Sequence, residues 1–579
     1  MTSSSRNVAF HPGNRCSCDR LQTAAAFYKL IDPDRALLED TSMFPTADRN
    51  LANRTPGMSL HADPPAASRT AAVITAIAVA VLLVSASAFA AERPNIVFIY
   101  ADDLGYGDLG CYNPESKAPT PNLDRLAAEG MRFTDAHSPS TVCTPSRYGV
   151  MTGRMPFRLN YRGVFTGVEG PCLITADRLT LPEMLRRRGY TTAVFGKWHI
   201  GMTFVDRDGK PVYETSQKRG VELVRHADLS RRIKDGPLDR GFDQFFGTVC
   251  CPTTDWIYAW IEGDRVPVPP TVVRDRSKLP SHAYSRDCRP GLIAPDFDLE
   301  EVDMVFLEKS KAFLEKHVKE QPDKPFFLFH SAQAVHLPSF PGKAFQGKTK
   351  AGPHGDFIFE FDHVVGELLD TLKRLKVAEN TLVIVSSDNG PEVLTAIHMR
   401  ADYQHDGARP WRGVKRDQWE GGHRVPFIAR WPGRIQAGSV SNQTICQTDI
   451  MATCAAITGF ALPDDAAEDS FDLLPVLLGE DVSEPVRPYT LHQTMSLALA
   501  IRRGPWKYLD HKGSGGNNYT RDGLREYALP DTAPDAPGQL YNLEADPGET
   551  SNLYFQHPEI VRELKLLLEQ SKRSGRSRP

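Results

Sequence analysis

The segment Pro94-Asn95-Ile96-Val97-Phe98-Ile99-Tyr100 leads directly into Ala101-Asp102-Asp103-Leu104-Gly105. A short, continuous apolar run of this kind is typical of a parallel strand buried on both faces. Two carboxylates stand where this strand gives way to a loop, a position that favours a functional role over simple solvation. The segment therefore predicts a central strand whose carboxyl end carries chemistry.

Three further apolar runs end in the same way. Residues 191–195 lead into Lys197 and His199, residues 325–330 precede His336, and residues 381–386 precede Asp388 and Asn389. Helical patterns over residues 123–129, 181–188, 300–318 and 360–376 separate these runs. Because parallel strands end along one edge of an open sheet, we expect the polar groups to converge there.

These patterns predict an α/β fold with a large mixed, mostly parallel sheet flanked by helices, over residues 93–485. Beyond about residue 486 the pattern changes to short strands at 496–502 and 506–509, the segment Leu540-Tyr541-Asn542-Leu543, and a closing helix at 559–568. This predicts a small C-terminal α+β domain at residues 486–579, built from an antiparallel sheet and a helix.

The composition excludes some classes of protein. The chain has 579 residues and a net charge of −4, so no global basic field exists to hold nucleic acid through its phosphates. Its length exceeds that of a single ordinary core, which favours one large domain plus a smaller one. Because the chain has no global positive charge, any site for an anion must be formed by a local group of residues.

The N-terminal region carries a predicted export signal. Residues 1–70 lack a sustained period, which predicts a disordered or untranslated extension, whereas residues 71–91 are apolar, follow Arg69 and end in Ala88-Phe89-Ala90. This pattern predicts a signal peptide, or a membrane anchor if it is not cleaved. Because signals stand at chain starts, we expect translation from Met58 and a mature, periplasmic or secreted protein beginning near Ala91.

Eight cysteines follow the predicted signal, and export would permit disulfides among them. Sequence does not specify their pairing. A bond between the neighbours Cys250 and Cys251 would be strained, so we expect no disulfide between these two.

Oxygen ligands are concentrated at two of the predicted strand ends. Asp102, Asp103, Asp388 and Asn389 offer only oxygen atoms, which suits a hard cation, calcium by preference and magnesium as the alternative. The competing interpretation is two unrelated turns, since Asp-Asn-Gly is also a frequent turn sequence. Their shared position after buried strands favours the metal site.

A reactive side chain is predicted at a helix start in Cys143-Thr144-Pro145-Ser146-Arg147. Free backbone N–H groups at a helix start favour an anion. The simpler interpretation is an unreactive free thiol. The cationic and titratable groups Arg147, Lys197, His199, His336 and Lys415 would together neutralise an oxyanion and exchange protons near neutral pH, as ester cleavage requires.

The Cys-x-Pro-x-Arg segment resembles the signature of the formylglycine-dependent sulfatases, a family related to alkaline phosphatases. Further motifs similar to that family follow in its order, and together they cover the chain from about Arg93 to its end. They are Thr-Gly-Arg at 152–154, GKWHIG at 196–201, HLP at 336–338, SSDNG at 386–390, RGVK at 412–415, EGGHRVP at 420–426, and the tail segments AIRRGPWKYLD and LYNLEADPGETSNL.

The resemblance implies a chemistry. A formylglycine-generating or radical maturase enzyme would convert Cys143 to formylglycine, whose hydrate attacks sulfur and gives a sulfated enzyme. Calcium would be held by Asp102, Asp103, Asp388, Asn389 and the modified Cys143. In this mechanism, which the resemblance implies, His336 protonates the leaving alcohol. His199 removes the proton from the second hydroxyl of the formylglycine hydrate. Lys197 and Lys415 hold sulfate oxygens, and Arg147 positions the hydrate.

Three alternatives stay open at this point. A phosphoester hydrolase of the same superfamily typically uses Ser or Thr with a His-rich zinc set, unlike this chain. An arylsulfatase acting on small aryl sulfates shares the chemistry. A non-catalytic glycan-binding relative would keep the anion site without a working nucleophile.

The substrate is predicted from the insertion at residues 201–299. It contains Trp256-Ile257-Tyr258-Ala259-Trp260, whose aromatic faces suit sugar rings, and Asp255, which we expect to contact a sugar hydroxyl. Sulfated carbohydrate is therefore the expected substrate. The competing interpretation is that these aromatic side chains pack the core of the insertion itself.

Overall fold

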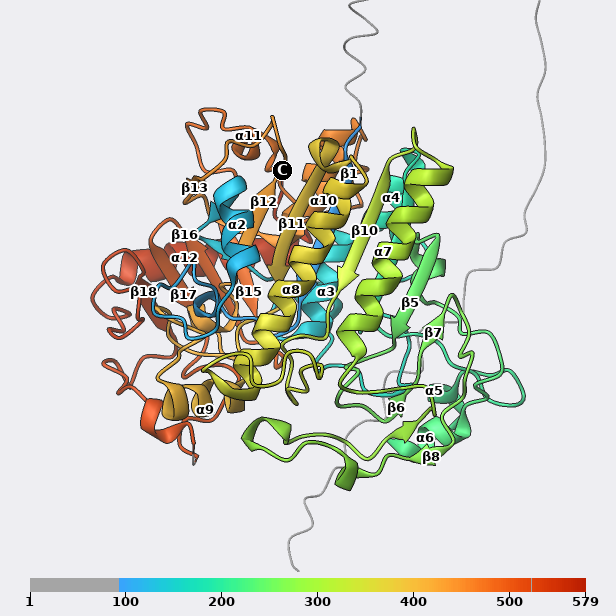
Figure 1. Ribbon diagram of the computed structural model, residues 1–579. Helices are drawn as coiled ribbons and strands as arrows, with labels where there is room; N and C mark the ends of the chain where they lie inside the picture. Colours follow the sequence, from blue (N-terminus) through green and yellow to red (C-terminus); the bar gives the residue numbers. More distant parts are fainter. Residues whose placement is uncertain (1–92, 522, 579) are drawn as a thin grey trace, which may run out of the picture. The chain divides into compact units, whose positions relative to one another are not determined.

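A nine-stranded sheet forms the centre of the computed structural model, which describes residues 93–521 and 523–578 (Figure 1). The strand order is β13-β2-β12-β11-β1-β10-β4-β5-β7. Its four central strands lie side by side and parallel, and they are β11 (Thr381–Ser387), β1 (Asn95–Ala101), β10 (Phe326–Ser331) and β4 (Thr191–Lys197). These are the four apolar runs of the sequence, and all of their residues are buried.

The sheet becomes mixed toward its two edges. On one side β5 (Gln244–Thr248) is parallel to β4, and β7 (Ile261–Glu262) is antiparallel to β5. On the other side β12 (Phe427–Arg430) runs antiparallel to β11 and to β2 (Met131–Phe133), and β13 (Ser439–Ser441) closes the edge. The predicted mixed, mostly parallel sheet is confirmed.

Helices cover both faces of the sheet, as Figure 1 shows. One face carries α2 (Pro121–Glu129), α7 (Val302–Glu320) and α8 (Gly352–Arg374), which pack against one another. The opposite face carries α3 (Cys143–Thr152), α4 (Leu181–Arg187) and α10 (Ile450–Thr458). Strands buried between two helical layers must be apolar throughout, which explains their continuous hydrophobic runs.

The predicted helix boundaries are mostly close, with two clear errors, since the closing helix runs to Ser574, six residues beyond its predicted end, and α8 starts early. Helix α8 begins at Gly352, eight residues before the predicted start at 360. Pro353 in its first turn is compatible with a helix start, and Phe357, Ile358 and Phe361 already bury an apolar face. The charged residues around Glu360 therefore do not mark the start of this helix.

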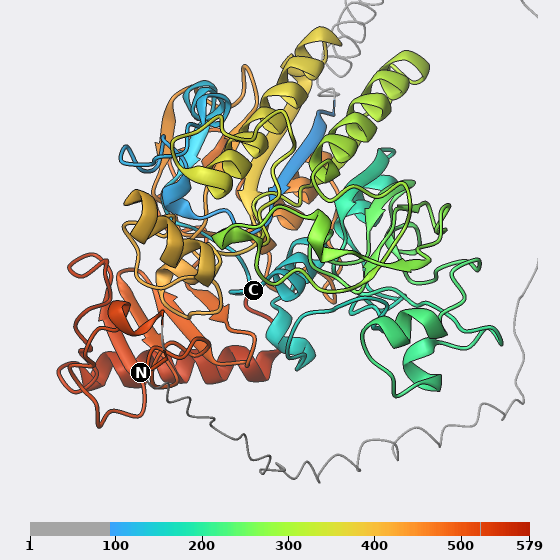
Figure 2. The same ribbon diagram turned by 60° about the horizontal axis from the view of Figure 1, so that its bottom comes forward.

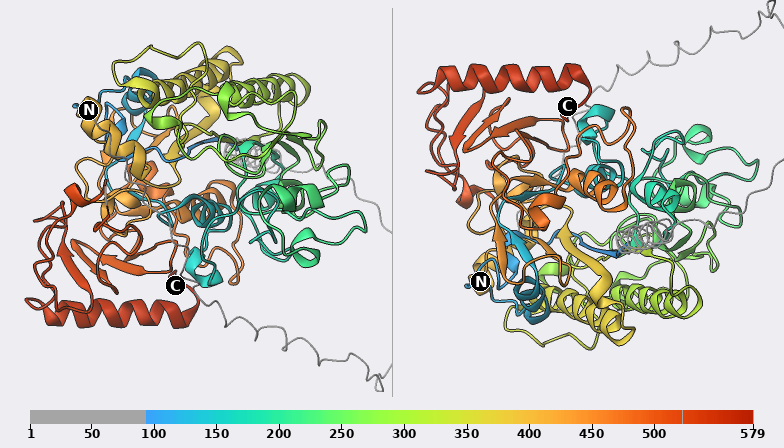
Figure 3. Two further views of the ribbon diagram at one scale, coloured as in Figure 1. Left: turned by 90° about the horizontal axis from the view of Figure 1, so that it is seen from below. Right: turned by 90° about the horizontal axis from the view of Figure 1, so that it is seen from above.

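The C-terminal part forms a second, four-stranded antiparallel sheet. Its order is β15 (Thr490–Gln493), β16 (Leu499–Arg503), β17 (Trp506–Leu509) and β18 (Gln539–Asn542), and strand β15 was not predicted. Helix α12 (Pro558–Ser574) lies along this sheet against β16 and β17 (Figures 2 and 3). Its buried Val561, Leu564 and Leu568 repeat with helical spacing and fix the contacting face.

Shorter elements complete the described chain. The insertion after β4 contains α5 (Val212–Thr215), α6 (Val221–His226), β6 (Ile257–Tyr258), β8 (Val272–Val273) and β9 (Leu292–Ile293), and elsewhere lie β3 (Ala136–His137), α9 (Val393–Tyr403), β14 (Ile445–Cys446) and α11 (Leu474–Leu477).

The described residues group as one compact unit, so the division at residue 486 stays a prediction. The predicted extension and signal fall outside the described residues. Within the described residues, no helix is both long and apolar enough to cross a bilayer. The eight cysteines there are all free thiols.

Candidate active site

Strand register brings the two acidic strand ends together. Ala101 of β1 lies opposite Ser387 of β11, so the following residues, Asp102 and Asp388, are neighbours. The Asp388 amide donates to the Ala101 carbonyl at 3.2 Å, and the Asp103 amide donates to Asp388 Oδ1 at 3.2 Å. Asn389 Nδ2 donates to Asp103 Oδ1 at 2.7 Å. The four predicted oxygen ligands therefore form one buried cluster.

Helix α3 supplies the predicted nucleophile. Cys143 is its first residue, preceded by Val142 in an extended conformation, and every residue of the helix is buried. Arg147 lies one turn further, where its Nε donates to Asp388 Oδ2 at 2.9 Å and its Nη1 donates to Ser331 Oγ at 2.6 Å. The helix start and the acidic cluster are thus tied by a buried ion pair.

Two lysines bring positive charge into the cluster. Lys197, the last residue of β4, pairs with Asp102, and Lys415 Nζ lies 2.7 Å from Asp103 Oδ1. Lys415 also lies 3.4 Å from Glu392 Oε2. Although burial opposes ionisation of Asp102, the nearby Lys197 holds its pKa below the usual range. Both predicted sulfate-binding lysines therefore lie at the acidic cluster.

His199 is held in one tautomer by the backbone. Its Nε2 lies 2.8 Å from the Phe165 carbonyl oxygen, which can only accept, so Nε2 carries the proton. The buried Nδ1 has no hydrogen-bond partner and keeps its lone pair, and the nearby Cys143 influences the pKa of this ring. Burial lowers the pKa of His199. The ring is therefore neutral and able to accept a proton from a group at position 143.

His336 lines the same cavity as His199. Its Nε2 is 3.7 Å from Asp103 Oδ2 and 3.8 Å from the Cys251 Sγ, and its buried Nδ1 has no hydrogen-bond partner. Burial, with the positive charge of Lys415, lowers its pKa to about 3. An anionic group bound between His336 and Lys415 would favour the protonated ring, which a proton donor needs.

The acidic cluster fits a cation. One side-chain atom each from Asp102, Cys143 and Asp388 lie within 4.8 Å of one another. The buried oxygens Asp102 Oδ1 and Asn389 Oδ1 have no hydrogen-bond partner, which is costly unless a ligand satisfies them. Burial, together with Asp102, raises the pKa of Asp388 well above its usual value. A hard cation would remove both penalties.

Four of these residues, Cys143, His199, His336 and Lys415, line a cavity of about 570 Å³. Its wall joins the start of α3 to loops that follow several strands of the central sheet, and its lining comprises Val142, Cys143, Val164, Phe165, Thr166, His199, Cys250, Cys251, Thr254, Asp287, Arg289, His336, Leu337, Glu392, Leu394, Lys415, Arg416 and Met495. The predicted nucleophile and both predicted histidines therefore face one space that can hold a small anionic ester.

Comparison with known proteins identifies the family. The family model for sulfatases matches residues 94–460. The chain belongs to the sulfatase family. It is a sulfuric ester hydrolase of the formylglycine type within the alkaline phosphatase superfamily, as the Cys-x-Pro-x-Arg resemblance implied.

Relatives match the sulfatase over most of its length. N-acetylgalactosamine-6-O-sulfatase of Bacteroides thetaiotaomicron is 34% identical over 83% of this chain and 93% of its own. Arylsulfatase A of Homo sapiens is 33% identical over 84% and 89%. A solved structure from work on glycosaminoglycan metabolism by Bacteroides thetaiotaomicron superposes with a TM-score of 0.69 at 32% identity, covering 83% of this chain and all of that one.

The position of Asp255 does not support its predicted contact with a sugar hydroxyl. Asp255 is buried outside the cavity lining, and its Oδ1 accepts hydrogen bonds from the amides of Gly167 and Trp256. Burial raises its pKa to about 7. Trp260 stacks on Phe246 with ring centroids 5.3 Å apart, so this aromatic residue packs the core around the insertion, as the competing interpretation had it.

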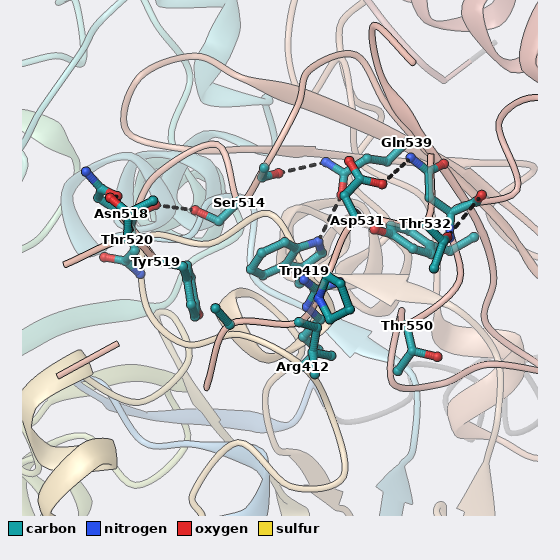
Figure 4. Close-up of a pocket in the computed structure, with 17 residues that line it drawn as sticks. Arg412, Trp419, Ser514, Asn518, Tyr519, Thr520, Asp531, Thr532, Gln539 and Thr550 are labelled. Atoms are coloured by element: carbon teal, nitrogen blue, oxygen red, sulfur yellow. Dashed lines mark hydrogen bonds between the residues drawn. The ribbon is translucent and has the colours of Figure 1, made fainter. Parts of the chain in front are cut away.

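A second cavity, of about 320 Å³, lies beside the C-terminal sheet (Figure 4). Polar side chains surround Trp419 in this cavity, but several of them form hydrogen bonds with one another. Trp419 Nε1 donates to Gln539 Oε1 at 3.3 Å, and Tyr541 donates to the same oxygen at 2.6 Å. No cysteine or histidine lines this cavity within the described chain, so it is not the catalytic site.

Several residues of the catalytic cavity were not predicted from the sequence. Cys251 follows the end of β5, a strand that was not predicted, and Glu392 lies only three residues beyond Asn389. Glu392 is buried and binds Arg416 with contacts of 2.7 and 2.9 Å. A search for charged residues throughout the loops after buried strands would have found Glu392.

Proposed function

We propose that this sulfatase hydrolyses sulfate monoesters of carbohydrates, using a formylglycine made from Cys143 by a formylglycine-generating or radical maturase enzyme. The observation that carries the proposal is the convergence of Cys143, Lys415 and two histidines on one cavity, with Lys197 and the oxygen cluster buried next to them. When hydrated, the formylglycine supplies the nucleophile at the first turn of α3.

The surrounding residues have roles that follow from their contacts. His199, with its proton on Nε2, presents Nδ1 as the base at position 143. His336 lines the same cavity, where it can protonate a leaving alcohol once the bound sulfate favours its charged form. Lys197 and Lys415 hold sulfate oxygens, and Arg147 fixes the helix start against Asp388.

Asp102, Asp103, Asp388 and Asn389, with the modified residue 143, would hold calcium. The all-oxygen donor set and its two unpartnered oxygens support this assignment, and magnesium is the alternative. When bound, the cation would offset the crowded negative charge and polarise a sulfate oxygen.

The substrate proposal rests on the relatives and on the cavity. Two relatives are named for N-acetylgalactosamine 6-sulfate chemistry, and a cavity of about 570 Å³ has room for a sugar unit. Arylsulfatase A, at 33% identity, supports small aryl sulfates as the second candidate.

A substrate panel tests the proposal. Sulfated monosaccharides and oligosaccharides should be hydrolysed with kcat/KM well above that for nitrophenyl sulfate. Faster turnover of aryl sulfates would reject the carbohydrate assignment and leave the sulfatase intact. Faster turnover of aryl phosphate would favour the phosphoester alternative, and tight binding of a sulfated sugar without turnover by fully converted protein would favour the non-catalytic one.

The state of Cys143 is tested separately by peptide mass spectrometry of active protein. We expect formylglycine at this position, and a fully active sample with only an unmodified thiol would contradict the mechanism. Cys143→Ala should lower kcat by at least about 1,000-fold, because the nucleophile is lost. Its thermal unfolding should stay close to that of the parent protein.

A further inference from the structure

A buried carboxylate of α7 holds the loop that follows β10. Asp303 stands in the first turn of this helix and has almost no exposed surface. Its Oδ1 accepts a hydrogen bond from the Gln333 amide at 2.8 Å, and its Oδ2 accepts one from the Ala334 amide at 3.0 Å. One side chain therefore fixes two successive peptide groups just ahead of His336.

The backbone of the same loop is paired with the residue that follows β1. The Asp102 amide donates to the Ala334 carbonyl at 3.0 Å, and the Val335 amide donates to the Asp102 carbonyl at 2.7 Å. Residue 334 is thus bound at its amide by Asp303 and at its carbonyl by Asp102. A change at Asp303 would release the amide and leave the pairing with Asp102 in place.

The His336 ring depends on this backbone for its position. The His336 amide donates to the Gln333 carbonyl at 3.0 Å, which closes a turn over residues 333–336. The imidazole itself is weakly held, because its Nδ1 has no hydrogen-bond partner among the described residues. Its Nε2 contacts Asp103 and Cys251 at 3.7 and 3.8 Å, distances longer than an ordinary hydrogen bond. Asp303 binds the first amides of the turn, although it does not line the catalytic cavity.

We propose that Asp303 is a positioning residue for protonation of the leaving alcohol. It acts through the turn at residues 333–336, which places the His336 ring at the cavity. The proposal rests on the proposed function, in which His336 donates that proton. Such a donor must lie within hydrogen-bond reach of the leaving oxygen, and a displacement of about 1 Å can lower a rate about 100-fold.

Asp303→Asn should make the rate depend more steeply on the leaving group. Asparagine keeps the shape of the side chain but replaces one acceptor oxygen with an N–H donor, so one loop amide loses its partner. A sugar alcohol leaves only with a proton, whereas nitrophenolate can leave as the anion. We expect kcat/KM to fall about 10- to 100-fold for a sulfated monosaccharide and to change little for nitrophenyl sulfate. The ratio of the two values does not depend on enzyme concentration, so partial unfolding of the variant does not alter it.

Aryl sulfates whose leaving phenols have graded pKa values make the same comparison without a sugar. In the variant, log kcat/KM should fall more steeply as the pKa of the phenol rises. An equal loss for every leaving group would overturn the proposal, because general damage to the site affects all substrates alike. Inhibition by inorganic sulfate should stay unchanged. Weaker inhibition that accounts for the whole loss would assign the effect to sulfate binding and would also overturn the proposal.

Asp356→Asn is the matched control. Asp356 is a buried carboxylate of α8 that accepts hydrogen bonds from the amides of Gly347 at 2.7 Å and Thr349 at 2.8 Å, in a loop that does not line the cavity. This variant loses the same kind of hydrogen bond, so its unfolding temperature should fall while its leaving-group dependence stays that of the parent protein. An equally steep dependence in both variants would reject the proposal. Asp303→Glu keeps both acceptor oxygens but displaces them by one carbon atom, and it provides the same comparison if Asp303→Asn does not fold.

His336→Gln separates this proposal from the proposed function. If His336 is the proton donor, this variant should steepen the leaving-group dependence at least as much as Asp303→Asn does. An unchanged dependence in His336→Gln would contradict the proposed role of His336 and, with it, that of Asp303. A steeper dependence in His336→Gln but not in Asp303→Asn would reject the role of Asp303 alone. Absence of turnover of sulfated sugars by the parent protein would contradict only the carbohydrate assignment, and the aryl sulfates would still decide the role of Asp303.

Discussion

Arg289 differs from the other cations of the catalytic cavity in its partners. Its Nη1 donates to the Thr254 carbonyl at 2.7 Å and its guanidinium lies over the Trp256 ring, and it forms no ion pair with a described carboxylate. Arg416, on the same cavity, is instead neutralised by Glu392. A half-buried arginine that forms no ion pair, close to a site that cleaves anionic esters, is suited to a second negative group of the substrate.

Arg289→Gln should therefore discriminate between substrates. For sulfated oligosaccharides that carry a second sulfate or a carboxylate, we expect kcat/KM to fall about 10- to 100-fold, the loss of one hydrogen-bonded charge contact. For a singly charged aryl sulfate the change should be small. The control is Arg286→Gln, three residues earlier and exposed. Equal losses on both substrate types would show that Arg289 serves the fold instead.

At the scale of elements, the metal site depends on the ends of β1 and β11. Removing divalent cations with a chelator should abolish activity and lower the unfolding temperature, and calcium should restore both. A ligand present at 100 times its Kd stabilises a protein by about 2.7 kcal/mol, so the shift should be measurable.

The matched variants are Asp388→Asn and Asp108→Asn. Asp108 is a buried carboxylate that bonds His405 at 2.7 Å outside the cluster, so its variant should keep the calcium-dependent rise in unfolding temperature. Asp388→Asn should lose that rise. Full activity in protein that elemental analysis finds free of metal would contradict the metal requirement.

A second group of elements meets where the C-terminal sheet contacts the catalytic part. His137 of β3, His423 and His492 of β15 are buried together, and the rings of His423 and His492 stack with centroids 4.0 Å apart. Neither nitrogen of His492 has a hydrogen-bond partner. Burial lowers the pKa of all three histidines. Arg502 and Lys507 nearby add to the cost of a further positive charge.

The unfolding free energy should therefore decrease in acid. Above about pH 6.5 the histidines are neutral in both states and contribute no pH dependence. Below this pH the histidines of the unfolded chain bind protons, whereas those of the folded cluster stay neutral. The free energy of unfolding then falls by about 1.4 kcal/mol per pH unit for each such histidine. His492→Phe preserves a stacking ring and should flatten this slope in denaturant titrations between pH 5 and 6.5. An unchanged slope would exclude His492 as its source.

The central strands could be predicted from the sequence, whereas most loop residues that line the catalytic cavity could not. The four central strands could be predicted because burial between two helical layers requires continuous apolar runs, and the polar residues at their ends followed from topology. Cys251, Glu392 and Arg289 could not be placed, because their positions depend on how loops fold back over the sheet edge. Asp255 was misplaced for the same reason, since an acidic side chain in a loop can bind backbone amides as readily as substrate.

At the scale of the whole molecule, we propose that the sulfatase is exported, to the periplasm or the outside of the cell. The apolar segment 71–91 and its small-residue end support cleavage after Ala90. N-terminal sequencing of native protein should start near Ala91. A terminus at Met1 would refute the proposal, and recovery of the intact segment in membranes would indicate an anchor.

The pairing of β1 with β11 joins residues that are made at very different times. Asp103 and Asp388 are 285 positions apart, and the cluster exists only when their strands lie in the observed register. A slip of one residue would turn the carboxylates to opposite faces of the sheet. A ribosome must therefore have released about two thirds of the chain before any catalytic cluster can assemble. Enzyme activity consequently reports on synthesis beyond β11 and on correct strand alignment, and a nascent chain stalled before β11 cannot hydrolyse sulfate esters during translation.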